Sequence, residues 1–159
     1  MANGSLKIGL GFGIASGVIT TVGLMIGLYS STFSKGIVLA GILTVAIADS
    51  FSDALGIHFS EESSGLKSTK QIWQSTIFTL ISKFIITISF LPLILLLPLK
   101  LAVILDVIYG VLILLIYSFI MAKKQNNNPY KAILEHLSIM FLVLFITYFT
   151  GRAIDKLFL

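Results

Sequence analysis

Residues 6–30 read LKIGLGFGIASGVITTVGLMIGLYS, an apolar stretch whose one charged side chain, Lys7, stands at its beginning. A helix that crosses a bilayer needs about 20 consecutive, mostly apolar residues. The stretch is too long for the apolar core of a signal peptide, and no small-residue cleavage site follows it before the next apolar stretch. We therefore predict a membrane-spanning helix that stays in the protein.

The composition of the whole chain agrees with this prediction. Of its 159 residues, 57% are hydrophobic and only 11% are charged, and the mean hydropathy is +1.03. Soluble globular proteins carry about 25% charged residues. A chain with so few charges would expose large apolar patches in water, so most of its surface must face lipid.

Four further stretches are long and apolar enough to span a membrane. Pro92 and Pro98 mark the end of the stretch that begins near residue 73, because proline cannot continue a helix without a kink. The sequence therefore predicts an all-α integral membrane protein, with one transmembrane domain over residues 1–159. Its five helices are expected at about residues 6–30, 36–58, 73–98, 100–121 and 130–157.

The basic residues of the loops predict the orientation. With the N-terminus in the cytoplasm, the cytoplasmic side carries more lysines than the far side, as is typical of multi-pass proteins. The comparison is Lys7, Lys67, Lys70, Lys123, Lys124 and Lys131 against Lys35, Lys100, Arg152 and Lys156. We interpret the net charge of +4 in this way and expect no nucleic-acid partner. Five helices cannot form two equal inverted halves, so a symmetric pathway would require a two-fold homodimer.

Several chemistries are excluded or unsupported. The chain has no cysteine, which excludes disulfides, thiolate metal sites and cysteine nucleophiles. It contains no phosphate-binding loop and none of the metalloprotease, serine-hydrolase or nucleotide-binding motifs. We expect neither an enzyme nor a bound cofactor, and any transport would be driven by a gradient.

The first predicted helix carries small residues at four-residue spacing, which places them on one face. Such a face lets another helix approach closely in lipid. The partner could be any helix of the same chain, or the same helix of a second copy in a dimer. The residues expected to pack are Gly9, Gly13 and Gly17, with the hydroxyls of Ser16 and Thr20 lining a polar seam.

The second predicted helix carries two acids, Asp49 and Asp53, one turn apart and therefore on one face, with Ser52 beside them. One Asp at mid-membrane depth costs about 3 kcal/mol on insertion scales. Two carboxylates flanked by hydroxyls suit a hard divalent cation. They could equally carry protons, because mutual repulsion and burial favour the neutral form. A third interpretation is that basic or hydroxyl groups elsewhere, with Lys83 the obvious candidate, satisfy both acids. A fourth is that Asp53 lies near the cytoplasmic headgroups.

A second group lies at the predicted cytoplasmic end. His58, Glu61 and Glu62 follow the two acids, and Glu135 with His136 begins the last helix. Carboxylates with imidazole suit Mn²⁺, Fe²⁺ or Zn²⁺, so the first three are candidate metal ligands at an entrance. Ordinary anchoring at the membrane surface explains them as well. We expect the fourth helix to place Asp106 near the outer surface, beside Lys100.

At these residues the sequence resembles the vacuolar iron transporter family over nearly the whole chain. The family's Gly-x-x-Asp-Gly-Leu-Val-Thr motif corresponds to residues 13–20, and its Ser-Met-Ala-x-Gly-Glu-Tyr motif to residues 48–54, followed by 58–62. Its Pro-Leu segment matches residues 92–93 and 98–99, and its closing Thr-Tyr-x-x-Gly-Arg signature matches residues 147–152. Ser16 stands where the family has Asp, Asp49 where it has Met, and Asp53 where it has Glu.

The resemblance implies a five-helix homodimer with a pathway between the two first helices, and proton-coupled export of Fe²⁺ or Mn²⁺ from the cytoplasm. The cytoplasmic metal-binding domain of longer members is missing, since only residues 61–72 occupy its place. We therefore predict a multi-pass divalent-metal/proton antiporter, in the cell membrane if the source is prokaryotic. The alternatives are a non-transporting membrane scaffold of the same fold and a transporter of another solute.

Overall fold

The computed structural model describes residues 2–158, and these residues contain helices and connecting turns but no strand. The helices are α1 (Ala2–Thr32), α2 (Lys35–Ser64), α3 (Thr69–Ile88), α4 (Leu91–Leu96), α5 (Leu99–Lys124) and α6 (Pro129–Phe158). By length and composition, five segments of this part of the chain could cross a membrane, with α3 and α4 together forming the third. The prediction of an all-helical protein with five candidate spans is confirmed.

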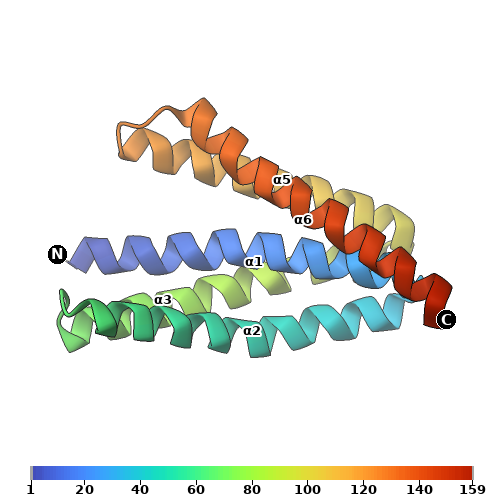
Figure 1. Ribbon diagram of the computed structural model, residues 1–159, viewed down its shortest axis with the longest axis horizontal. Coiled ribbons are helices and arrows are strands. Elements are labelled where there is room, and N and C mark those ends of the chain that lie inside the picture. The colour runs from blue at the N-terminus through green and yellow to red at the C-terminus, as the bar shows by residue number, and fades with distance from the viewer. Residues whose placement is uncertain (1, 159) are drawn as a thin grey trace.

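Helix α1 lies at the centre of the bundle and packs against α2, α3, α5 and α6. Figure 1 shows α2 and α3 on one side of α1 and α5 with α6 on the other, so that the bundle has two halves that share α1. Much of the remaining apolar surface is exposed, as expected where the solvent is hydrocarbon. Buried core residues from both halves contact each other around α1: Val18, Val22, Met25, Val38, Ile42, Phe90, Ile94, Val103, Leu114 and Met140.

The observed helices extend beyond several of the predicted ends, and two differences affect the fold. The second helix does not end at residue 58 but continues to Ser64. Gly65 stops it in the left-handed conformation (φ 63°) and donates its backbone N–H to Glu62, a capping geometry that costs glycine little. The third span breaks after Ile88, and α4 follows with a proline in its first turn. Proline is tolerated there because a first-turn N–H has no helical acceptor.

The glycine face of α1 contacts α3 of the same chain. A Cβ atom at Gly9 would lie 2.5 Å from the Ser75 carbonyl oxygen, and one at Gly13 would lie 2.8 Å from the Thr79 carbonyl oxygen. At Gly17 the nearest atom is a methyl of Ile86, at 3.1 Å. The close-packing interpretation is confirmed, but the assignment of Gly9, Gly13 and Gly17 to a dimer contact is wrong, because α3 already occupies that face.

The bundle has two ends that differ in the chain segments they hold. At one end, here called the amino end, α1 begins, α2 ends, α3 begins, α5 ends and α6 begins (Figure 1). The opposite end holds the connections from α1 to α2 and from α4 to α5, together with the end of α6.

Candidate functional site

A lysine from α3 lies between the two acids of α2. The side chain of Lys83 is fully buried, and its Nζ forms ion pairs with Asp49 and with Asp53. Asp49 lies near the middle of α2 and Lys83 near the middle of the span formed by α3 and α4, about 20 Å from either end at 1.5 Å per residue. The charges therefore meet near the middle of both candidate spans.

Ser16 of α1 completes the cluster. Its hydroxyl accepts a hydrogen bond from Lys83 Nζ at 2.9 Å and donates one to Asp53 Oδ2 at 2.6 Å. The ammonium group has three N–H donors, and all three have a partner in Ser16, Asp49 and Asp53. We call these four residues the Lys83 cluster. The structure thus shows the predicted contact of Lys83 with both acids.

With both carboxylates ionised and Lys83 protonated, the Lys83 cluster would carry a formal charge of −1. The lysine is enclosed, whereas 33% of the Asp49 side chain and 21% of the Asp53 side chain remain exposed on the monomer. A net negative charge with carboxylate surface still uncovered would be unfavourable against lipid hydrocarbon.

The exposed face of α2 beside these acids is built from small residues. One side of α2 is buried by Val38, Ile42, Ala46, Ser50 and Ala54. Residues two positions further along point to the opposite side, because two residues turn a helix by about 200°. That side carries an exposed small-residue stripe at four-residue spacing, which consists of Ala40, Thr44, Ala48, Ser52, Gly56 and Ser60.

The stripe lies between two different neighbours around the helix. On one flank, at positions 49 and 53, are the two acids. On the other flank are large exposed apolar side chains: Leu43, Ile47, Phe51, Leu55 and Phe59. The large side chains suit lipid tails, whereas small residues permit close approach of another helix. Ser52, predicted to line the pathway, belongs to this stripe.

Thr20 donates its hydroxyl to the Ser16 carbonyl oxygen at 2.8 Å and makes no hydrogen bond to the acids.

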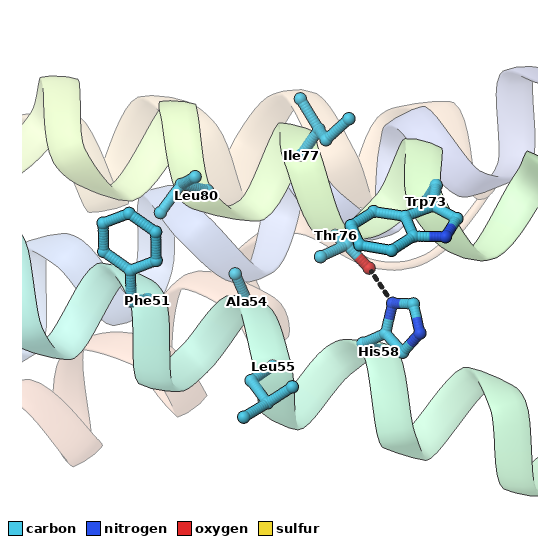
Figure 2. A pocket seen from close by; sticks show the side chains of 8 residues that line it. All are labelled: Phe51, Ala54, Leu55, His58, Trp73, Thr76, Ile77 and Leu80. Carbon is cyan, nitrogen blue, oxygen red and sulfur yellow. Dashed lines mark hydrogen bonds between the residues drawn. The ribbon is translucent and has the colours of Figure 1, made fainter.

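His58 does not join the acids. Its Nδ1 lies 3.0 Å from Thr76 Oγ1, and that hydroxyl already donates to the Ile72 carbonyl, so His58 donates. Its ring also packs edge-on against Trp73. Figure 2 shows both contacts at one end of a groove of about 310 Å³ between α2 and α3, whose other lining side chains are apolar. This environment is that of an aromatic anchor at a membrane surface.

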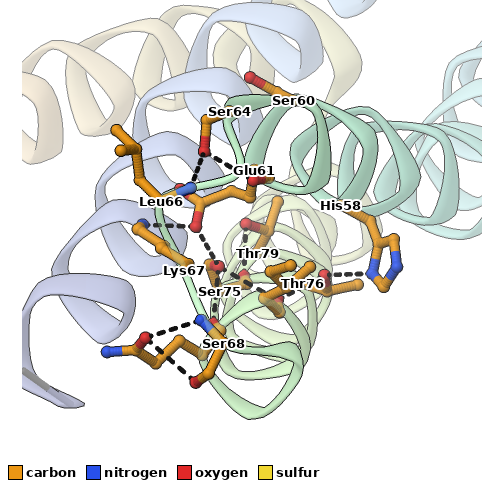
Figure 3. Close-up of polar contacts among 12 residues, drawn as sticks. His58, Ser60, Glu61, Ser64, Leu66, Lys67, Ser68, Ser75, Thr76 and Thr79 are labelled. Carbon is orange, nitrogen blue, oxygen red and sulfur yellow. Dashed lines mark hydrogen bonds and ion pairs between the residues drawn. The ribbon is translucent and has the colours of Figure 1, made fainter.

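The two glutamates are also engaged elsewhere or exposed. Glu61 forms an ion pair with Lys67 and accepts a hydrogen bond from Ser75 at 3.2 Å, which ties the end of α2 to the start of α3 (Figure 3). Glu62 is exposed. No group of three or more acidic, histidine or cysteine side chains suited to a metal ion occurs within residues 2–158. The structure thus does not bring His58, Glu61 and Glu62 together with Asp49 and Asp53.

A separate cavity of about 350 Å³ lies at the amino end between α1, α5 and α6, and is here called the vestibule. Glu135 and His136 line it together with Tyr117 and Ser118. His136 Nδ1 lies 2.7 Å from the Ser118 hydroxyl, which itself donates to the Leu114 carbonyl oxygen. Both residues that the sequence placed at the start of the last helix thus face a polar cavity, but not the Lys83 cluster.

Two features were not predicted from the sequence. The first is the small-residue stripe of α2, which repeats every four residues, the same spacing that predicted the packing face of α1. Asp106 is buried within the bundle with no hydrogen-bond partner for either carboxylate oxygen, and Lys100 is exposed. The expected salt bridge between Asp106 and Lys100 is therefore wrong, whereas the position of Asp106 toward the outer membrane surface stays a prediction. Its helical face, shared with buried Ala102 and Gly110, was readable from the sequence.

Comparison with protein-family models, with curated proteins and with solved structures finds no match for this chain.

Proposed function

We propose that the protein is a proton-coupled transporter of a divalent metal ion, Fe²⁺ or Mn²⁺, out of the cytoplasm, and that the Lys83 cluster is its coupling site. The observation that carries the proposal is a fully buried lysine that forms ion pairs with two partly exposed carboxylates near the middle of the candidate spans. Intramembrane acids and bases that pair with each other are typical of ion pathways and proton relays.

The proposed coupling follows from the charges. A divalent ion on Asp49 and Asp53 would neutralise them, but the same ion together with a protonated Lys83 would leave +1 in a medium of low dielectric constant. Metal binding therefore favours loss of the Lys83 proton, or its movement away from the acids. Return of the proton restores the ammonium group and displaces the metal. The metal ion and the protonated Lys83 side chain thus compete for the same two carboxylates, and this competition is what couples metal movement to proton movement.

We infer that a second copy of the chain covers the exposed side of the acids. The uncovered parts of Asp49 and Asp53 flank the small-residue stripe of α2, and small residues permit close helix packing in lipid. In a two-fold dimer the two stripes would face each other. Two Lys83 clusters would then lie across the interface, and each would bind one divalent ion on its own two carboxylates. This arrangement agrees with a homodimeric pathway lined by Ser16 and Ser52.

The test is metal flux into proteoliposomes that contain an Mn²⁺-sensitive dye, with and without an imposed pH gradient. Wild type should accelerate Mn²⁺ uptake only with the gradient. Asp49→Asn and Asp53→Asn should each reduce this flux at least tenfold, and Lys83→Met should abolish its dependence on the gradient. Asp155→Asn, at the opposite end and paired with Arg152, is the matched control and should transport normally. Unchanged flux in all three cluster variants would remove the cluster from the mechanism.

A non-transporting membrane scaffold is the second candidate, and the complete burial of Lys83 with all its donors satisfied favours it. In that case the cluster holds α1, α2 and α3 together and carries nothing. Wild-type liposomes would then show no Mn²⁺ or Fe²⁺ flux under any gradient, although the cluster variants would still be less stable. A transporter of another solute would differ again, since flux of that solute would respond to the cluster variants while metal would not.

A further inference from the structure

Asp106 is an acidic side chain that the Lys83 cluster does not use. It is fully buried, and neither carboxylate oxygen has a hydrogen-bond partner. It lies about 10 Å along α5 from Leu99, at 1.5 Å per residue. No hydrogen bond or ion pair connects it to Lys83, whose partners are Ser16, Asp49 and Asp53.

Apolar layers enclose the carboxyl group on both sides along α5. One turn before it, Ala102 and Val103 are buried in the hydrophobic core. One turn after it, Gly110 packs so closely that an added Cβ would lie 2.9 Å from Val22 of α1. The same Cβ would lie 3.3 Å from Met140 of α6. Position 106 is therefore closed toward both ends of the bundle.

No charged group from the neighbouring elements compensates Asp106. The helices packed against α5 are α1, α4 and α6, and α4 has no ionisable residue. Besides Asp106, the ionisable residues of α5 and of its neighbours α1 and α6 are as follows: Lys7 and Tyr29 on α1, Lys100, Tyr109, Tyr117, Lys123 and Lys124 on α5, and Tyr130, Lys131, Glu135, His136, Tyr148, Arg152, Asp155 and Lys156 on α6. None is within hydrogen-bond distance of Asp106. The Tyr109 hydroxyl, one turn away, donates to Ser89, and Arg152 pairs with Asp155.

An ionised carboxylate in such a place would be a buried charge with neither counter-ion nor donor, which is far more costly than a neutral carboxyl group. The closed conformation therefore requires a proton on Asp106. Ionisation requires water or a cation to reach it, and that requires one of the two apolar layers to open. The vestibule lies beyond the Gly110 layer, since its lining includes Leu114 and Ser118 of the same α5 face, and a second cavity of about 330 Å³ is lined by Lys100, Val103 and Val107 on the other side of Asp106.

We propose that Asp106 is a sealed proton-binding site, separate from the Lys83 cluster, that is protonated in this conformation and exchanges its proton only when one of the two enclosing apolar layers opens. The ligand is a proton. The step is a transfer from the carboxyl O–H to water, which leaves a carboxylate and a hydronium ion, and reprotonation reverses it. The proposal does not depend on which ion the Lys83 cluster carries, because the resting protein is already protonated at Asp106.

Infrared spectroscopy of the protein in lipid tests it, because a protonated carboxyl group has a C=O stretch distinct from that of a carboxylate. Wild type at neutral pH should show this band, and Asp106→Asn should lose it. Asp155→Asn, in which the removed acid is ion-paired at the opposite end, should keep it. In D₂O the band should shift slowly, at the rate at which an enclosing apolar layer opens, and more slowly than most exposed amides exchange.

Absence of the band in wild type, or its persistence in Asp106→Asn, would overturn the proposal. A complete shift of the carboxyl band within the mixing time in D₂O would show that Asp106 is open to solvent, which would contradict the proposal. If Asp106→Asn does not fold, judged by circular dichroism, Asp106→Glu keeps the carboxyl group and should move the band, and an unmoved band would then refute the assignment. Loss of metal transport in the liposome assay changes none of these outcomes, so the two proposals fail separately.

Discussion

At the scale of single residues, Lys83 decides which interpretation of the α2 acids holds. Paired acids one turn apart are compatible with a metal site, a proton site or a structural ion pair, and only the side chain between them distinguishes these. The ammonium group makes three polar contacts, one for each of its N–H donors. With both acids ionised the cluster would carry a charge of −1, and we therefore propose that it binds a further cation.

Lys83→Met should destabilise the protein strongly, because it leaves two carboxylates in the membrane interior without their partner. Breaking a buried ion pair costs about 3–5 kcal/mol, and since both acids keep some exposure we expect about 3 kcal/mol. The measurement is the thermal unfolding midpoint in detergent. The triple variant Lys83→Met, Asp49→Asn, Asp53→Asn removes every charge and should recover most of the loss, and exposed Lys70→Met should change little. A single variant as stable as wild type would contradict the pairing.

At the scale of helices, the same spacing of small residues has two different outcomes. On α1, Gly9, Gly13 and Gly17 contact α3 within the chain. On α2, the small-residue stripe remains exposed. Both are typical of close helix packing in lipid, and the partner depends on which face the connections between the helices turn inward. The short turn after α1 and the capped turn at Gly65 place α3 against the α1 glycines, which leaves the α2 stripe outside.

Gly13→Ala should lower stability without affecting assembly, since its Cβ would lie 2.0 Å from Ser82 Oγ and 2.8 Å from the Thr79 carbonyl oxygen. Forcing atoms into such a contact costs about 1–3 kcal/mol. Gly4→Ala, on the same helix, is the matched control, because no atom lies within 4 Å of its added Cβ. The check is the unfolding midpoint of both variants under identical conditions. Equal midpoints would mean that α1 and α3 are further apart than the structure has them.

At the scale of the complete bundle, the two halves around α1 differ in what they leave exposed. The half with α2 and α3 presents partly exposed acids beside the small-residue stripe. The half with α5 and α6 encloses Asp106 and contains the vestibule. If a second copy covers the stripe, the Lys83 clusters lie at the centre of the assembly and the two vestibules at its periphery.

Ser52→Leu should weaken the dimer, because it places a large side chain in the middle of the small-residue stripe. We expect the dissociation constant in lipid to rise at least tenfold, which corresponds to about 1.4 kcal/mol. Single-molecule photobleaching in vesicles at graded protein-to-lipid ratios measures it. Ile47→Leu, on the large apolar flank, is the control and should leave the dimer intact. A wild type that is monomeric at every ratio would contradict the inferred interface.

The sequence alone was enough to predict a lipid-facing surface, an all-helical fold and five candidate spans. The reason is that a chain so apolar and so poor in charge must satisfy its backbone polar groups within helices when it lies in lipid. The sequence was also enough to place Asp49 and Asp53 on one face, which requires helix geometry alone. The packed bundle was needed to show that Lys83 lies between them, that α3 occupies the glycine face of α1, and that Asp106 is enclosed. The physical reason is that contacts between helices depend on how each helix is rotated about its axis, and that rotation is set by the packing of all the helices together.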